Sequence, residues 1–229
     1  MKKITMASKN MRLIRLLTIF ASFLFSVLLV PHTILAADPL SDQPRWSTEV
    51  KGGLFYPDID EWKTYYGKNN TYHLAGTIAF KLFRQLEVGI EGGYIRDKGQ
   101  GFAPGHGNPA GSVIYELFPL QAFLVFRWVF SEEQWFVPYF GGGWTRMYYR
   151  EKIEFQGDVK GSADGYHARA GLQFLLDDLD PDAANKFYSD YGVHHTYFFL
   201  EAQYISAVIG TPEIDLGGTS FLAGLLFEY

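Results

Sequence analysis

Apolar and polar side chains alternate along most of the chain that follows residue 45. In the first such segment, Trp46 to Tyr56 (WSTEVKGGLFY), Val50, Leu54 and Tyr56 share one parity, whereas Ser47, Glu49 and Lys51 share the other. Successive side chains of a strand point to opposite faces, so this pattern predicts a strand with one apolar face. Seven further segments extend the series of predicted strands, which together span residues 46–56, 72–82, 86–96, 114–130, 136–150, 165–176, 195–208 and 218–229. Only 136–150 has an ambiguous facing, because Arg146 shares the parity of Trp144.

The connections between these segments alternate between short and long. Residues 83–85 and 131–134 are tight, whereas 57–71, 97–113, 151–164 and 209–217 are longer and rich in Gly, Pro, Asn and charge. A membrane β-barrel has such an alternation, with brief periplasmic turns and longer outer loops. The segment 177–194 is an exception, being long where a turn is due. Its Asp180-Pro181 pair is typical of a helix N-cap followed by Pro at the first helical position, which predicts a short periplasmic helix over 181–188.

The two parities differ in chemistry as a membrane barrel requires. Large aromatic residues crowd the apolar parity near the strand ends, as in the girdles at the two membrane interfaces. The other parity carries full charges in mid-strand, on Glu49, Lys51, Lys81, Glu87, Glu91, Arg127, Arg169 and Glu201. Hydrocarbon offers no partner to a free sheet edge, so the sheet must close. We therefore expect an all-β, closed antiparallel up-and-down transmembrane β-barrel, with eight strands favoured and ten left open.

The N-terminus has the features of an export signal. Basic residues precede an apolar run over residues 16–30, Pro31 breaks it, and a small-residue site follows. A retained inner-membrane anchor is the alternative, but the run is shorter than the ~20 residues of a spanning helix. We expect a cleaved secretory signal peptide over 1–37, a periplasmic lead-in over 38–45, a barrel domain over 46–229, and a place in the outer membrane of a Gram-negative cell.

Composition narrows the function classes. The 229 residues carry a formal net charge of -5, which gives no support to nucleic-acid binding. There is no cysteine, so disulfides and thiolate chemistry are excluded. Aromatic residues make up 17% of the chain beside 24 glycines, a combination that suits a small barrel with close-packed strands.

The last segment carries a resemblance to a known family. Its outward parity holds the residues Phe221, Ala223, Leu225, Phe227 and Tyr229, and Glu228 falls on the inward one. An alternating last strand with a C-terminal aromatic resembles that of outer-membrane β-barrel proteins, in which it is the signal read by the barrel-assembly machinery. The resemblance implies that role for these five residues.

The wider chain also resembles small eight-stranded barrels of the OmpA/OmpX kind. The segments VPYFGGGWTRMYYRE, GSADGYHARAGLQFLLDDLDP, YGVHHTYFFLEAQY and LGGTSFLAGLLFEY are similar to a group of proteobacterial outer-membrane barrels with no assigned activity. This resemblance covers most of the chain after the signal peptide, and it implies a fold but no mechanism.

The charged residues of the inner parity are the first candidate for chemistry. An eight-stranded barrel encloses little more than its own side chains, and an unpaired charge there costs several kcal/mol, so we expect the eight residues to form an ion-pair network. A narrow solute path or a proton relay is the alternative. Histidine supports no metal site, because the adjacent His194 and His195 point to opposite faces and His73 and His167 lie on strands that are not neighbours.

Enzyme hypotheses find little support in the sequence. A lipid A deacylase of this fold needs a His-x-Ser pair, and the nearest match, His194-His195-Thr196, lacks the serine. A palmitoyl transferase needs His, Asp and Ser near the outer rim, for which His106, Asp97 and Ser112 are candidates.

The predicted function is therefore a structural or surface-interaction role, without catalytic turnover, cofactor or metal. A lipid A-modifying enzyme and a small-solute pore are the alternatives. The expected partners are outer-membrane lipid and lipopolysaccharide, the barrel-assembly machinery, and an extracellular partner that binds the outer loops around 61–66 and 102–107. Those loops are equally compatible with solvated caps. We expect a monomer.

Overall fold

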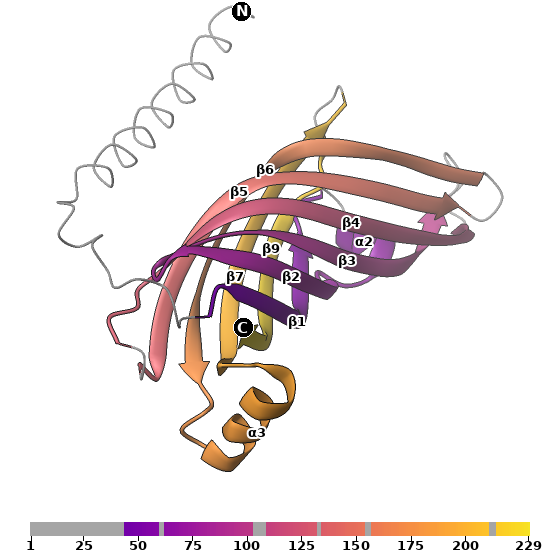
Figure 1. The fold of residues 1–229 in the computed structure, drawn as a ribbon. Helices are drawn as coiled ribbons and strands as arrows, with labels where there is room; N and C mark the ends of the chain where they lie inside the picture. Colours follow the sequence, from indigo (N-terminus) through magenta and orange to yellow (C-terminus); the bar gives the residue numbers. More distant parts are fainter. Residues whose placement is uncertain (1–43, 60–61, 103–108, 132–133, 154–156, 211–213) are drawn as a thin grey trace, which may run out of the picture. The chain divides into compact units, whose positions relative to one another are not determined.

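The chain folds into a closed antiparallel barrel of eight long strands (Figure 1). The computed structural model describes residues 44–59, 62–102, 109–131, 134–153, 157–210 and 214–229. The long strands are β1 (Trp46–Pro57), β2 (Thr71–Phe83), β3 (Leu86–Phe102), β4 (Pro109–Arg127), β5 (Phe136–Ile153), β6 (Gly157–Leu175), β7 (His195–Ile209) and β9 (Gly218–Glu228). The short strand β8 (Ile214–Asp215) pairs only with the end of β7.

Each long strand pairs with two neighbours, so the sheet has no free edge in the barrel wall. Pairing follows chain order from β1 to β7, β7 pairs with β9, and β9 returns to β1, where Lys51 lies opposite Gly224. This ring satisfies the backbone hydrogen bonds between strands, as hydrocarbon requires. The predicted eight-stranded barrel is confirmed, and the ten-stranded alternative is wrong.

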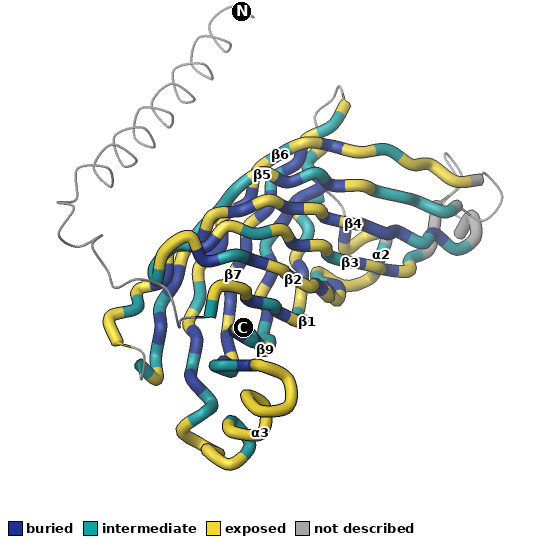
Figure 2. The backbone as a smooth tube through the Cα atoms, in the orientation of Figure 1, coloured by how far each residue is buried: buried dark blue, intermediate teal, exposed yellow. Residues whose placement is uncertain are grey.

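The period-two pattern of the sequence is the pattern of burial along the strands. On β2, Thr71, His73 and Thr77 are buried, whereas Tyr72, Leu74 and Ile78 between them are exposed. Figure 2 shows the same alternation of buried and exposed positions along the other strands. In the middle of the barrel, polar side chains are thus on the inside and apolar ones on the outside, the reverse of a water-soluble barrel.

Exposed aromatic side chains form two girdles on the outer face. Trp46, Trp128 and Trp135 lie near the end that carries both barrel termini, and Tyr56, Tyr72 and Tyr166 lie near the opposite end, which carries the longer loops. Tyr166 and Phe174 on β6 are eight residues apart, or about 27 Å along a strand. The two girdles bound an apolar band between them, as in transmembrane barrels.

The termini end of the barrel carries the short connections and one helix. The Trp46 N–H donates to the Tyr229 carbonyl at 3.0 Å, which joins the first and last strands there. Helix α3 (Pro181–Tyr191) lies between β6 and β7; Asp180 accepts from the Ala183 N–H at 3.0 Å, and Gly192 ends the helix at φ 72°. The predicted helix is confirmed and runs three residues beyond 188. Neither α3 nor α2 (Trp62–Tyr66), the helices of the described residues, is long and apolar enough to cross a membrane.

Two predicted long loops are mostly strand, which corrects the sequence analysis. Residues 97–102 continue β3, 109–113 begin β4, and 151–153 and 157–164 extend β5 and β6. The register continues through these extensions, with Gln100 opposite Ser112 and Lys152 opposite Asp158. Their charge and glycine content predicted loops. A strand that extends beyond the membrane needs no apolar outer face, so its sequence lacks the alternation that identifies a strand. The predicted signal peptide 1–37 and residues 38–43 of the lead-in lie outside the described residues and stay predictions.

Candidate functional site: the polar interior

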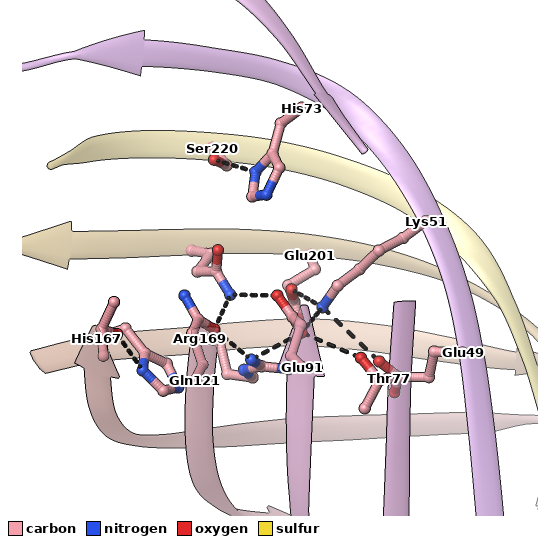
Figure 3. A network of polar contacts seen from close by, with 12 residues as sticks. Glu49, Lys51, His73, Thr77, Glu91, Gln121, His167, Arg169, Glu201 and Ser220 are labelled. Carbon is pink, nitrogen blue, oxygen red and sulfur yellow. Dashed lines mark hydrogen bonds and ion pairs between the residues drawn. The ribbon is translucent and has the colours of Figure 1, made fainter. Parts of the chain in front are cut away.

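A cluster of five charged side chains crosses the middle of the barrel. This central cluster consists of Glu49, Lys51, Glu91, Arg169 and Glu201, from β1, β3, β6 and β7. The Lys51 Nζ lies 2.7 Å from Glu91 Oε2 and 2.7 Å from Glu201 Oε1 (Figure 3). Arg169 Nη2 is 2.8 Å from Glu91 Oε2, and Arg169 Nη1 is 3.8 Å from Glu201 Oε2. Residues as far apart as 51 and 201 are thereby joined through the interior.

Glu49 is the loosest member of the central cluster. Its Oε2 lies 3.7 Å from Lys51 Nζ and accepts no hydrogen bond from the described residues. With two cations and three carboxylates, the cluster carries one formal negative charge more than it can pair.

A second cluster lies at the termini end. This terminal cluster consists of Lys81, Glu87, Arg127 and Glu228. Lys81 Nζ is 2.7 Å from Glu228 Oε1, Arg127 Nη1 is 2.8 Å from Glu87 Oε1, and Arg127 also pairs with Glu228. The Arg127 guanidinium donates to Gln173 at 2.8 Å and lies 5.2 Å from the centroid of the Tyr197 ring. Two cations and two carboxylates balance here.

All eight charged residues predicted for the interior are buried, and they divide between the two clusters. Glu228 was missing from the predicted network, although its inward parity was evident from the last strand. Uncharged polar residues were also missed. Gln203 Nε2 donates to Glu91 at 3.2 Å and to Gln121 at 3.0 Å, and the Tyr139 hydroxyl donates to Glu201 at 2.9 Å. Only the inward parity of these residues could have indicated a role in the network.

The two interior histidines lie within hydrogen-bond distance of hydroxyl groups on other strands. His73 Nδ1 is 2.9 Å from Ser220 Oγ, and His167 Nδ1 is 2.8 Å from Thr145 Oγ1. His195 instead pairs with Asp177 near the termini end, at 2.9 Å. Among the described residues, no group of three or more His, Cys, Asp and Glu side chains is arranged to hold a metal ion.

Apolar layers cover the polar interior on both sides. Towards the loop end, Phe55, Ile95, Leu117 and Met147 belong to a buried cluster that also contains Trp62 from α2. The Trp62 ring stacks on Tyr66 at 4.0 Å and meets Tyr115 edge-on at 5.4 Å. Burial raises the pKa of the Tyr115 hydroxyl, which therefore stays neutral. Towards the termini end, Val137, Leu175, Tyr197, Phe199 and Leu226 form a second cluster.

The loop rings predicted as a contact surface lie elsewhere than expected. Trp62, only 4% exposed, seals the barrel mouth, so it offers no surface to an outside partner. Of the palmitoyl-transferase candidates, Asp97 pairs with Lys68 at 3.1 Å, and His106 lies outside the described residues. The second predicted loop, 102–107, is described only at Phe102, the end of β3.

The predicted assembly-signal residues occupy the outer face of β9. Phe221, Leu225 and Tyr229 are exposed and Ala223 and Phe227 partly so, whereas Glu228 is inside. Since β9 pairs with both β1 and β7, its docking completes the ring.

Solved structures similar in fold to this chain include small outer-membrane barrels. The sequence matches no protein-family model and has no significant match among curated proteins. The outer membrane protein OprG from Pseudomonas aeruginosa matches with a TM-score of 0.54 and 12% sequence identity, over 82% of this chain and 97% of that one. Neisserial surface protein A matches with a TM-score of 0.53 and 10% identity, over 80% of this chain and 97% of that one. These likenesses concern the fold; together with the exposed apolar band they identify an integral outer-membrane barrel.

Proposed function

We propose that this integral outer-membrane barrel is a sealed structural protein of the envelope, without catalytic turnover, whose loop end serves surface interaction. The observation that carries the proposal is the filled interior. Along β7 alone, the buried residues run from Tyr197 and Phe199 through Glu201 and Gln203 to Ile205 and Ala207. A polar layer is thus enclosed between two apolar ones.

This layering opposes a solute path. Eight strands leave room for little besides their own side chains. A solute would have to displace the apolar cluster around Trp62 and then separate Lys51 from Glu91 and Glu201. Separating a buried ion pair leaves uncompensated charge and is strongly unfavourable.

Conductance measurements test the sealed barrel. The purified protein is inserted into planar bilayers, and folding is verified by heat-dependent gel mobility. We expect no steady single-channel conductance, whereas a porin inserted under the same conditions conducts. Steady conductance of the wild-type protein would overturn the proposal in favour of a small-solute pore.

Lipid analysis tests the absence of turnover. Lipid A from cells with and without the gene is compared by mass spectrometry, and we expect identical acylation. The sequence offers no His-x-Ser pair, because the third residue of the nearest match, His194-His195-Thr196, is a threonine. A gain or loss of one acyl chain would instead support a lipid A-modifying enzyme.

A further inference from the structure

The extended strands β3 to β6 carry a group of cations on their outer face. Arg96, Glu116, Arg150 and Lys160 lie opposite one another in one row across the four strands. The next row, farther from the membrane band, contains Lys98, Ile114, Lys152 and Asp158. We call these five cations and two carboxylates the outer cationic patch. Its formal net charge is +3, although the chain as a whole carries -5.

The carboxylate at the centre of the patch is already engaged. Glu116, 6% exposed, accepts from Arg150 Nε at 2.7 Å and from the Tyr94 hydroxyl at 2.9 Å, and its Oε2 lies 2.5 Å from Arg150 Nη2. Within the described part of the chain, no carboxylate lies within ion-pair distance of Lys160, which is exposed directly opposite Arg150. Like charges placed opposite each other on neighbouring strands destabilise a sheet, and an anion bound between them removes the repulsion.

A hollow lies beside these two cations. It has a volume of about 410 Å³ and is lined by Phe118, Tyr148, Tyr149, Arg150, Lys160, Gly161 and Ser162. The Phe118 and Tyr148 rings are 38% and 43% exposed, so the hollow combines apolar walls with two positive groups.

The height of the patch identifies the kind of ligand. Arg96 lies two residues beyond Tyr94, and Arg150 two residues beyond Tyr148, about 7 Å further along each strand. Rings such as Tyr94, Phe118 and Tyr148 mark the membrane interface, so the cations lie at the level of the lipid head groups. A ligand at this level that offers phosphate to the cations and apolar groups to the rings is a phosphorylated lipid.

We propose that the hollow between Arg150 and Lys160 binds a phosphate of lipopolysaccharide, the phosphorylated glycolipid of the outer leaflet. Arg150, held in place by Glu116, and Lys160 contact the phosphate oxygens, and Phe118 and Tyr148 contact the adjoining sugar and acyl groups. The inference requires the loop end to face outwards but does not depend on whether the barrel is sealed. A conducting barrel would overturn the proposed function and leave this site untouched.

Binding of defined lipids tests the site. The folded protein in detergent is titrated with bisphosphorylated lipid A, and retained lipid is counted by native mass spectrometry. Dephosphorylated lipid A, phosphatidylglycerol and inorganic phosphate are the comparison probes. Because a charge-assisted contact is worth about tenfold in affinity or more, we expect at least about a tenfold preference for bisphosphorylated over dephosphorylated lipid A. Equal binding of the two forms would overturn the proposal.

Variants distinguish lipid binding in the hollow from general attraction of the lipid to a positive surface. Arg150→Gln combined with Lys160→Gln is expected to lose the preference, whereas Lys63→Gln combined with Lys186→Gln, which neutralises two exposed lysines away from the hollow, keeps it. Ser162→Phe fills the hollow without changing its charge and is expected to weaken lipid A binding as well. Heat-dependent mobility verifies that each variant is folded. An unchanged preference in both the double glutamine variant and Ser162→Phe would overturn the site. Equal binding of phosphatidylglycerol, or displacement by inorganic phosphate alone, would overturn the assignment to lipopolysaccharide.

Discussion

The central and terminal clusters bury charge inside the same barrel in different ways. The terminal cluster is balanced, and Lys81 and Arg127 share one carboxylate, Glu228. The central cluster has a surplus carboxylate, and Lys51 alone lies within 4 Å of three of them. The comparison indicates that the cost of losing one cation depends less on the number of charges in the cluster than on whether a second cation pairs with the same carboxylates. Arg169 pairs with Glu91 and Glu201 beside Lys51 but leaves Glu49 to Lys51. Arg127 pairs with both carboxylates of the terminal cluster, so Lys81 has the more complete substitute.

The clusters also differ in when they can form. Glu228 lies on β9, the last strand, so the terminal cluster is complete only when β9 docks between β1 and β7. The central cluster draws all its members from β1, β3, β6 and β7 and needs no residue of β9. The terminal cluster therefore contains a residue of β9, whereas the central cluster joins β1 and β7, the strands on either side of β9.

The largest effect is expected from deleting Phe227–Tyr229. The deletion removes Glu228 and the outward rings at the end of β9, so we expect no folded barrel in the outer membrane and aggregates in the periplasm. Heat-dependent mobility of outer-membrane fractions measures the yield. Glu228→Gln in the full-length chain is the control: it removes the charge and keeps the rings. A truncated protein that reaches the outer membrane at the normal level would refute the assembly signal.

The second largest effect is expected from replacing one cation in each cluster, and its size should differ between the two clusters. Lys51→Met leaves one cation among three carboxylates, and breaking a buried pair in this way costs about 3–5 kcal/mol. Lys81→Met leaves Arg127 paired with Glu228 and is expected to cost clearly less. Urea unfolding of both variants in lipid vesicles measures the difference. Equal losses of stability would contradict the role of Arg127 as a substitute.

The sequence could predict which residues are inside but not which of them meet. Facing follows from a period of two, and it placed Glu49, Lys51 and Glu201 inside correctly. Partners depend on strand tilt and stagger, which bring Lys51 to Glu201 across 150 positions and leave Glu49 at the margin. The strand extensions that carry Lys98 and Lys160 were missed for a different reason. Beyond the bilayer both faces are polar, and the alternation that reveals a strand disappears.

Arginine substitutions on the outer face of β9 are expected to give the next largest loss of stability. Leu225 is 41% exposed on β9, between the girdles, and Leu225→Arg should cost about 2–4 kcal/mol if this position lies near the bilayer midplane. Phe221→Arg, on the same face near the loop-end girdle, should cost about 0–1 kcal/mol. Gly224→Ser is also expected to destabilise the barrel, because a Cβ there would lie 2.4 Å from the Val50 carbonyl oxygen and 2.8 Å from the Phe199 ring. Unfolding free energies in vesicles check the ranking, and equal costs at 221 and 225 would contradict the assigned depth.

The smallest effect is expected at the surplus carboxylate of the central cluster. Glu49 is 3.7 Å from Lys51 and its Oε2 lacks a hydrogen-bond donor among the described residues, so Glu49→Gln removes an excess negative charge at the loss of one weak contact. A buried charge that is poorly paired contributes little or is unfavourable, and we expect a change within about 1 kcal/mol, of either sign. Glu228→Gln, which loses contacts with both Lys81 and Arg127, should destabilise the barrel by more. Urea unfolding of the two variants under identical conditions decides the matter. If Glu49→Gln is as damaging as Glu228→Gln, the central cluster has no surplus carboxylate, and the contrast between a balanced and an overcharged cluster is wrong.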